Sequence, residues 1–161
     1  VDKRLDILAG AIGNRFSGDD LAKLELGYAP PFSSAKDPVN LIGYFIQTIQ
    51  DGLVRQFYWQ AMPALVEEDA CLVDVRTSEE STQLAHIPGA VNLPLDELRS
   101  RLSELDRKKP VYVYCHSGQR SYLASRILSA NGFEVRHLAG GYRLYEQVTR
   151  DKGRPSVVCT T

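Results

Sequence analysis

The sequence predicts an α/β domain with a parallel sheet, preceded by a helical block. From about residue 55 onwards, short apolar runs of strand length alternate with segments that have the period of a helix. This alternation is typical of βαβ units, in which helices cover both faces of a parallel sheet. Residues 2–50, in contrast, carry helical patterns separated by glycine and proline. The 161 residues are enough for one domain with an appendage.

Composition and charge narrow the possible classes of protein. The chain is 43% hydrophobic and 24% charged, which is ordinary for a globular protein with a real core. The net charge is -1 without a long run of either sign, so we expect neither a nucleic acid nor a membrane surface as partner. No apolar run approaches the length of a membrane span, and no signal-peptide pattern opens the chain. The first residue, Val1, hints at a processed product or a piece of a longer protein.

The three cysteines, Cys71, Cys115 and Cys159, form an odd set without CxxC spacing. This argues against a disulfide framework or a structural zinc site and suits a reducing cytoplasm. The three histidines are scattered, so we expect no metal site. Cys71 lies in an apolar run, residues 70–75, and is interpreted as structural. Cys159 lies in a tail beyond Pro155 and is interpreted as exposed and incidental, with a thiol that accepts or resolves a sulfur as the alternative.

Helical patterns dominate the N-terminal block. Residues 2–15 place apolar side chains at helical spacing, and residues 17–26 restart a short helix. A proline-rich loop then ends in Asp37 and Pro38, an N-cap followed by proline at the first helical position. The helix expected over residues 39–52 is apolar around much of its circumference. We therefore expect it to pack on sequence absent from this chain or on another subunit.

The pattern after residue 55 places a cysteine at the carboxyl edge of the expected sheet. We expect strands over residues 70–76, 90–94, 110–114 and 133–138, and helices over residues 96–105, 120–132 and 141–150. In open parallel sheets, ligands bind at the carboxyl ends of the strands. Cys115 follows directly after the third of these strands.

The stretch from Cys115 to Arg120 is expected to form a tight loop that leads into the N-terminus of a helix. Backbone N–H groups there have no partner within the helix, and the helix dipole is positive at that end, so such a loop can hold an anion. Gly118 permits backbone angles that other residues avoid, and Arg120 adds a fixed positive charge. We therefore expect the loop to favour a thiolate or another sulfur anion on Cys115. The alternative, a buried cysteine that merely ends a strand, suits this polar loop poorly.

Four motifs resemble those of rhodanese-homology domains and occur in the same order. They are LVDVR at residues 72–76, HIPGAVNLP at 86–94, YCHSGQRS at 114–121 and GFEVRHLAGGY at 132–142. The resemblance covers about residues 53–150. It implies an α/β fold with a central five-stranded parallel sheet flanked by helices.

The same resemblance implies a sulfurtransferase. By position, Cys115 is the residue that takes sulfane sulfur from a donor, becomes a persulfide and passes the sulfur to a nucleophile. The backbone amides of five loop residues would cradle the terminal sulfur: His116, Ser117, Gly118, Gln119 and Arg120. Asp74 and Arg76 resemble the family's charged pair near the rim of the site and are interpreted as structural rather than catalytic.

The length of the cysteine loop separates sulfur transfer from phosphate chemistry. Related phosphatases use Cys-x5-Arg, a larger loop that suits a tetrahedral phosphate, whereas Cys115 and Arg120 here form Cys-x4-Arg. The histidine that commonly precedes a phosphatase cysteine is replaced by Tyr114. A cysteine-dependent phosphatase or arsenate reductase is therefore kept only as an alternative.

Residues 24–44, LELGYAPPFSSAKDPVNLIGY, resemble the end of the dimerisation domain of flavin- and NAD(P)H-dependent disulfide reductases. The similar type is the coenzyme A-disulfide reductases with a fused C-terminal rhodanese domain, which include NADH-dependent persulfide reductases. This assigns residues 1–52 to the C-terminal part of a dimerisation domain and residues 53–161 to the rhodanese-like domain. By motif position, Tyr28 is the candidate to reach the active site of a partner subunit. A packing tyrosine beside a proline loop is the alternative.

The other parts of such a reductase are missing from this chain. No GxGxxG fingerprint precedes a βαβ unit, so we expect the chain alone to bind no cofactor, whereas the full-length enzyme would use FAD, NAD(P)H and CoA. The expected partners are the missing upstream domains, a second copy bound through the N-terminal helices, and a small donor such as thiosulfate or the persulfide of CoA or another thiol. Sulfur would then pass from Cys115 to a flavin-linked thiol. A non-catalytic binding or assembly module is the alternative.

Overall fold

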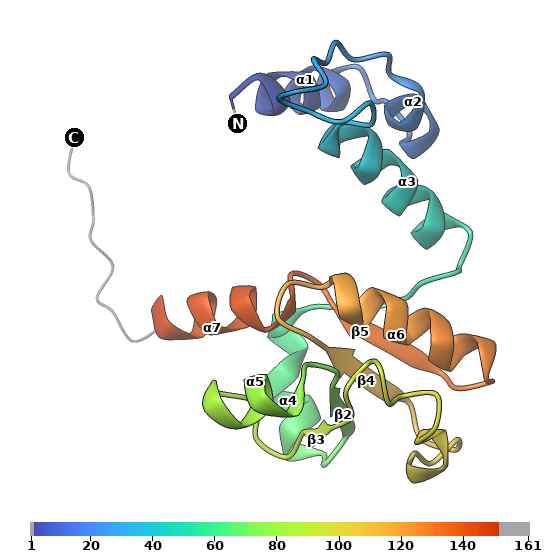
Figure 1. The fold of residues 1–161 in the computed structure, drawn as a ribbon, viewed down its shortest axis with the longest axis vertical. Coiled ribbons are helices and arrows are strands. Elements are labelled where there is room, and N and C mark those ends of the chain that lie inside the picture. Colours follow the sequence, from blue (N-terminus) through green and yellow to red (C-terminus); the bar gives the residue numbers. More distant parts are fainter. Residues whose placement is uncertain (1, 152–161) are drawn as a thin grey trace. The chain divides into compact units, whose positions relative to one another are not determined.

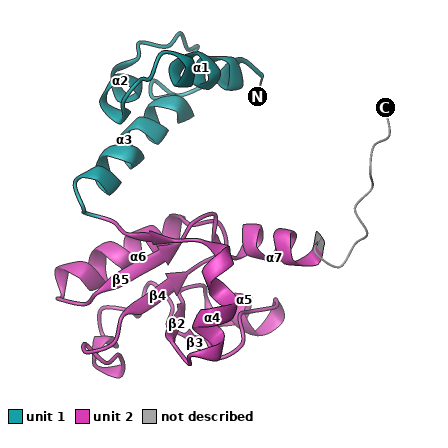
Figure 2. Ribbon diagram, turned by 180° about the vertical axis from the view of Figure 1, so that it is seen from behind, with its two compact units in different colours: residues 1–53 teal, residues 54–161 magenta. Residues whose placement is uncertain are grey.

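A computed structural model describes residues 2–151, and the chain divides into two compact units, residues 1–53 and residues 54–161 (Figure 2). The first unit contains three helices, α1 (Asp2–Gly13), α2 (Gly18–Lys23) and α3 (Pro38–Gln50) (Figure 1). The assignment of residues 1–52 to a reductase dimerisation domain stays a prediction.

The start of α3 agrees with the sequence prediction. The Asp37 carboxylate accepts the amide of Val39 at 3.0 Å, and Pro38 occupies the first turn. Gly43 allows α3 to approach α2 closely, because a Cβ there would collide with the backbone of Ala22. Asn40 is buried and donates its side-chain amide to the carbonyl of Leu21 at 3.1 Å, which ties the two helices together.

One side of α3 remains exposed in this chain. Its large apolar residues with high exposure are Leu41, Ile42, Tyr44 and Ile49. An exposed apolar helix face is typical of a surface that another element covers. This agrees with the expectation that α3 needs a further packing partner, and the identity of that partner stays a prediction.

The second unit is built on a five-stranded parallel sheet with the order β1-β5-β4-β2-β3, as the rhodanese resemblance implies. The strands are β1 (Gln56–Phe57), β2 (Cys71–Asp74), β3 (Val91–Asn92), β4 (Val111–Tyr114) and β5 (Val135–Leu138). β4 is the central strand. Its end lies in register with the end of β2, because Tyr114 pairs with Asp74.

The strands bury alternate residues on the two faces of this sheet, because successive side chains of a strand point to opposite sides. On one face, Val111 and Val113 pack with Leu128 of α6 (Gln119–Ala130). On the other face, Tyr114 packs with Met62 of α4 (Met62–Glu67) and with α7 (Gly141–Asp151). This arrangement confirms the α/β class with helices on both faces.

The prediction of an amphipathic helix over residues 96–105 is wrong. The structure has turns there, followed by a short 3-10 helix, Leu102–Glu104. Most backbone N–H groups there donate to the carbonyl three residues earlier, as in a 3-10 helix, rather than four residues earlier. The Ser100 hydroxyl donates to the Glu97 carbonyl at 2.8 Å and so competes with the backbone hydrogen bonds of a regular helix. Leu98 is nevertheless fully buried, so the spacing of the apolar residues indicates which side chains are buried and not that the segment is a helix.

Three further elements lack a clear sequence pattern. They are β1, α4 and α5 (Ser78–Gln83). A two-residue strand is too short for an alternating pattern, and α5, with the sequence SEESTQ, holds no apolar residue from which a period could be recognised. Among the described residues, no helix has the length and apolar character needed to cross a membrane.

Candidate active site

Cys115 directly follows β4 at the carboxyl edge of the sheet, as predicted. The alternation of β4 continues through it, so its side chain joins Val111 and Val113 on the α6 face. The residue is only 1% exposed. The sulfur therefore lies beneath the loop of residues 115–120 and the start of α6.

Two backbone amides point at the sulfur of Cys115. The N–H of Gly118 donates to Sγ at 3.2 Å, and the N–H of Ser121 donates at 3.3 Å. The thiol donates in turn to the Ser121 hydroxyl at 3.6 Å, and that hydroxyl donates to the Gly118 carbonyl at 3.0 Å. Sγ thus lies at the unpaired N–H groups of a helix start, a position that favours negative charge.

Ser121 is a site residue that the sequence analysis missed. The expected cradle consisted of the amides of residues 116–120, yet one of the two amides that reach Sγ belongs to the next residue. Ser121 is fully buried, and it stands within the quoted motif YCHSGQRS. Ser117 and Gln119, in contrast, are exposed, and His116 is half-buried.

Gly118 takes the conformation expected of it, with φ at 106°. The first turn of α7 then closes on the loop. The amide of Tyr142 donates to the Cys115 carbonyl at 2.8 Å, and the amide of Arg143 donates to the His116 carbonyl at 2.9 Å. Gly141 makes this approach possible, because a Cβ there would lie 2.6 Å from the carbonyl oxygen of His116.

The positive charge expected of Arg120 is paired with a carboxylate in the structure. Its two terminal nitrogens bind the two carboxylate oxygens of Glu80 in α5, at 2.5 and 2.8 Å. Arg120 holds the pKa of the Glu80 carboxyl down at about 2, and this ion pair also raises the pKa of the guanidinium. Glu80 carries no motif that would mark it in the sequence, since it lies 40 positions from Arg120.

Asp74 and Arg76 form a buried ion pair beside the loop, and their interpretation as structural rather than catalytic residues stays a prediction. The Arg76 guanidinium donates through Nε and Nη2 to the Asp74 carboxylate, at 2.9 and 2.6 Å, and neither side chain is more than 1% exposed. The guanidinium also lies 4.9 Å from the ring of Tyr142 and 5.8 Å from that of Tyr114. The pair therefore supports α7, which in turn holds the carbonyl of Cys115.

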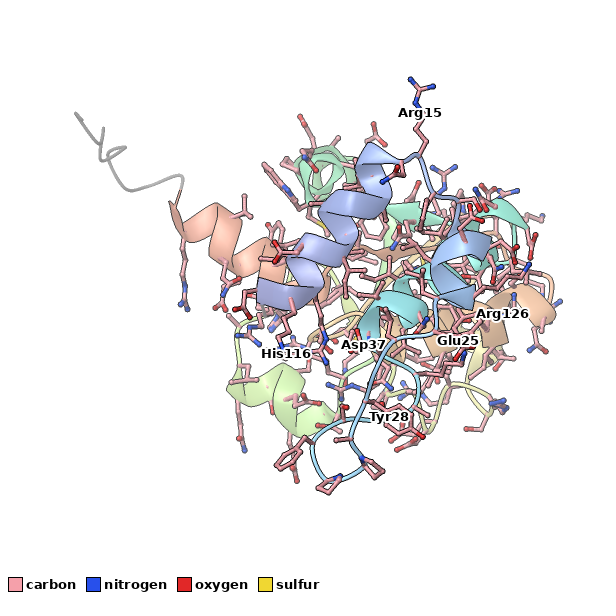
Figure 3. The ribbon with its side chains drawn as sticks, turned by 90° about the horizontal axis from the view of Figure 1, so that it is seen from above. Arg15, Glu25, Tyr28, Asp37, His116 and Arg126 are labelled. Carbon is pink, nitrogen blue, oxygen red and sulfur yellow. The ribbon has the colours of Figure 1, made fainter. Side chains whose placement is uncertain are left out.

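The remaining predicted residues lie away from this loop or outside the described residues. Cys71 stands at the amino end of β2, half-buried, and burial raises the pKa of its thiol, as suits a structural cysteine. Tyr28 belongs to the loop between α2 and α3 of the first unit and is exposed (Figure 3). Cys159 lies outside the described residues. Within residues 2–151, no group of three or more His, Cys, Asp or Glu side chains could hold a metal ion.

Comparison with known proteins shows similarity over both units. Bacillus anthracis CoADR-RHD in its reduced form is 45% identical, with a TM-score of 0.87, and the match covers 94% of this chain and 27% of that protein. A NAD-dependent persulfide reductase from A. fulgidus is 40% identical, with a TM-score of 0.75 over 89% of this chain and 25% of that protein. The chain thus spans only about a quarter of the length of these two proteins.

The chain also has shorter relatives. A sulfurtransferase from Allochromatium vinosum is 43% identical over 75 residues, which is 46% of this chain and 69% of that protein. The family model of the rhodanese-like domain matches residues 59–147, more than half of the chain and the whole of the cysteine loop. The chain therefore belongs to the rhodanese-like domain family.

Proposed function

We propose that the chain is a sulfurtransferase module that forms a persulfide on Cys115 and relays sulfane sulfur to a nucleophile. The observation that carries this proposal is the convergence of the Gly118 and Ser121 amides on a cysteine sulfur at the end of the central strand. Membership of the rhodanese-like family and the similarity to a sulfurtransferase support sulfur transfer in general.

In the loading step, the thiolate of Cys115 attacks the sulfane sulfur of the donor. A new S–S bond forms while the S–S bond of the donor breaks, and the leaving group departs with the electron pair, as sulfite from thiosulfate or as a thiolate from a thiol persulfide. In the second step, a nucleophile attacks the terminal sulfur of the persulfide, and Sγ leaves again as a thiolate. The two amides stabilise the negative charge on Sγ before the first step and after the second.

The context of the full-length protein extends this proposal. The similarity to CoADR-RHD and to a persulfide reductase supports a role as the C-terminal part of a flavin-dependent reductase with FAD, NAD(P)H and CoA as its cofactors. In that enzyme, Cys115 would pass sulfur from a thiosulfate or CoA-type donor to a flavin-linked thiol. The same proposal includes a dimer formed through the exposed face of α3 and a contact of Tyr28 with the partner subunit. It also includes a cytoplasmic location. Light scattering on the chain would test the dimer.

Mass spectrometry after incubation with thiosulfate or a thiol persulfide tests the central step. We expect a mass increase of one sulfur atom on Cys115, and thiocyanate production from thiosulfate and cyanide that Cys115→Ser abolishes. A chain that takes up no sulfur from either donor would contradict the proposal. Phosphatase activity without sulfur transfer would instead establish the alternative chemistry, and unchanged turnover of the full-length enzyme in Cys115→Ala would establish a non-catalytic module.

A further inference from the structure

Glu80 holds Arg120 through both of its carboxylate oxygens and is itself fixed in place. Its Oε2 atom also accepts the backbone amide of Thr77 at 3.1 Å, as part of the capping box that starts α5. Arg120 and Glu80 are each about a third exposed. Release of Arg120 therefore requires the loss of a bidentate ion pair whose acceptor is anchored by a helix cap.

Among the described residues, the buried and half-buried charged side chains near Cys115 have a net charge of zero. Arg120 is balanced by Glu80, and the fully buried Arg76 is balanced by Asp74. Arg120 is close enough to Cys115 for the two groups to interact electrostatically. Arg143 also borders the loop, but its side chain is exposed and its charge is screened by water. The positive potential at Sγ thus comes from backbone amides rather than from a net side-chain charge.

This balance matters for the charge of the donor. Thiosulfate carries two negative charges, and it must approach a thiolate. Without a net positive side-chain charge, repulsion between the two anions opposes the reaction. A persulfide of an uncharged thiol brings at most one negative charge, so it meets much less repulsion.

We propose that Glu80 determines the donor selectivity of this site: by neutralising Arg120, it disfavours doubly charged donors and favours organic persulfides. This inference rests on the proposed sulfur transfer at Cys115. Glu80 acts through Arg120 and is therefore a positioning residue. Its removal is expected to release the guanidinium toward the mouth of the site.

The test compares Glu80→Gln with Glu79→Gln, which removes the neighbouring exposed carboxylate of the same helix. Glutamine keeps the capping box, so α5 is expected to remain. The rate constant of sulfur loading on Cys115 is measured by quenched-flow mass spectrometry with thiosulfate and with the persulfide of 2-mercaptoethanol. We expect Glu80→Gln to accelerate loading from thiosulfate about tenfold and to change loading from the persulfide less than twofold. Glu79→Gln is expected to change neither rate.

A second variant ties the effect to Arg120. In Glu80→Gln combined with Arg120→Met, the gain with thiosulfate is expected to disappear, and a gain that persists would overturn the inference. Equal rate changes with both donors in Glu80→Gln would indicate a merely structural role and would also overturn it.

The salt dependence of the unmodified protein gives an independent measurement if Glu80→Gln does not fold. We expect sodium chloride to accelerate loading from thiosulfate, because it screens a net repulsion, and a rate that falls with salt would contradict the inference. The outcomes also separate the two proposals. A protein that loads from neither donor contradicts sulfur transfer itself, whereas normal loading with identical behaviour of Glu80→Gln and Glu79→Gln contradicts only the role of Glu80.

Discussion

The backbone amide of Tyr142 donates to the carbonyl of Cys115 at 2.8 Å, so α7 holds the residue that is proposed to carry the persulfide. This contact requires the backbone of α7 to approach the loop more closely than a side chain would allow. Gly141 provides that room, and its φ of 65° is also a conformation that favours glycine. The geometry of the cysteine loop thus depends on residues near the end of the described chain.

Gly141→Ala is therefore expected to displace the cysteine loop and to slow sulfur loading by about tenfold or more, because a shift of the order of 1 Å at a reacting group costs this much or more. The matched control is Gly89→Ala. Gly89 has a φ of 79°, but a Cβ there would meet no atom within 4 Å. We expect both variants to lose about 1 kcal/mol of stability from backbone strain. Gly141→Ala should lose more than this, because its Cβ would also collide with the loop backbone, and only Gly141→Ala should lose activity. Equal loading rates in the two variants would show that the close approach of α7 is not needed.

Ser121→Ala removes the hydroxyl that contacts Sγ but keeps the amide that donates to it. A thiolate can only accept, so in the reactive form the Ser121 hydroxyl is expected to turn and donate to Sγ. We therefore expect loading on Cys115 to slow by about fivefold to tenfold in Ser121→Ala, which corresponds to the loss of this one hydrogen bond of about 1 kcal/mol. Ser125→Ala is the control, because the Ser125 hydroxyl donates to the Tyr122 carbonyl at 2.7 Å in the same helix without contacting the sulfur. Both variants should lose similar stability in urea denaturation. A loading rate that falls as much in Ser125→Ala would indicate a general effect of α6.

Asp74→Asn leaves the fully buried Arg76 without its counter-charge. Removing one partner of a buried ion pair costs about 3–5 kcal/mol, so we expect a large decrease in the free energy of unfolding. Arg101→Met is the comparison, since Arg101 binds two exposed carboxylates and its loss should change the free energy of unfolding far less. Urea denaturation measures both values. A cost for Asp74→Asn as small as that for Arg101→Met would contradict the structural importance of the buried pair.

The buried His137 in β5 makes the stability of the second unit depend on pH. Burial lowers the pKa of its imidazole from 6.5 to about 4. The unfolded chain therefore takes up a proton as the pH falls through 6.5, while the folded chain remains neutral at that position until near pH 4. The contribution of the neutral His137 to the free energy of unfolding is present in full above pH 6.5. It is lost as the pH falls, by about 2 kcal/mol between pH 7 and pH 5.

Melting temperatures of the unmodified chain and of His137→Leu at pH 7 and pH 5 test this expectation. The variant should have a flatter pH dependence, because leucine binds no proton. This range lies above the ordinary pKa of 4.5 of a glutamate carboxyl, and the stability from the ion pair of Glu80 with Arg120 is lost only as the pH falls below that value, so the pair contributes little to the change. Parallel pH profiles of the two proteins would contradict the role of His137.

Local patterns in the sequence were sufficient for much of the fold. The start of α3 at Asp37 and Pro38, the strand that ends before Cys115 and the helix that follows the loop were all predicted from propensity, capping and periodicity. These signals act over a few residues, so a single sequence contains them. The five-stranded sheet was implied by the resemblance to rhodanese-homology domains rather than by these local signals, and β1 itself was too short to be located.

The sequence by itself thus determined the α/β class, the position of Cys115 at the carboxyl edge of the sheet and the short loop that follows it. Only the tertiary structure decided what surrounds the sulfur: the neutralisation of Arg120 by Glu80 and the contact of Gly141 with the loop. Glu80 lies 40 positions from its partner, in a polar helix without a periodic pattern. Such pairings depend on which parallel strands become neighbours, and that order is set by the packing of the whole sheet rather than by any local stretch of the chain.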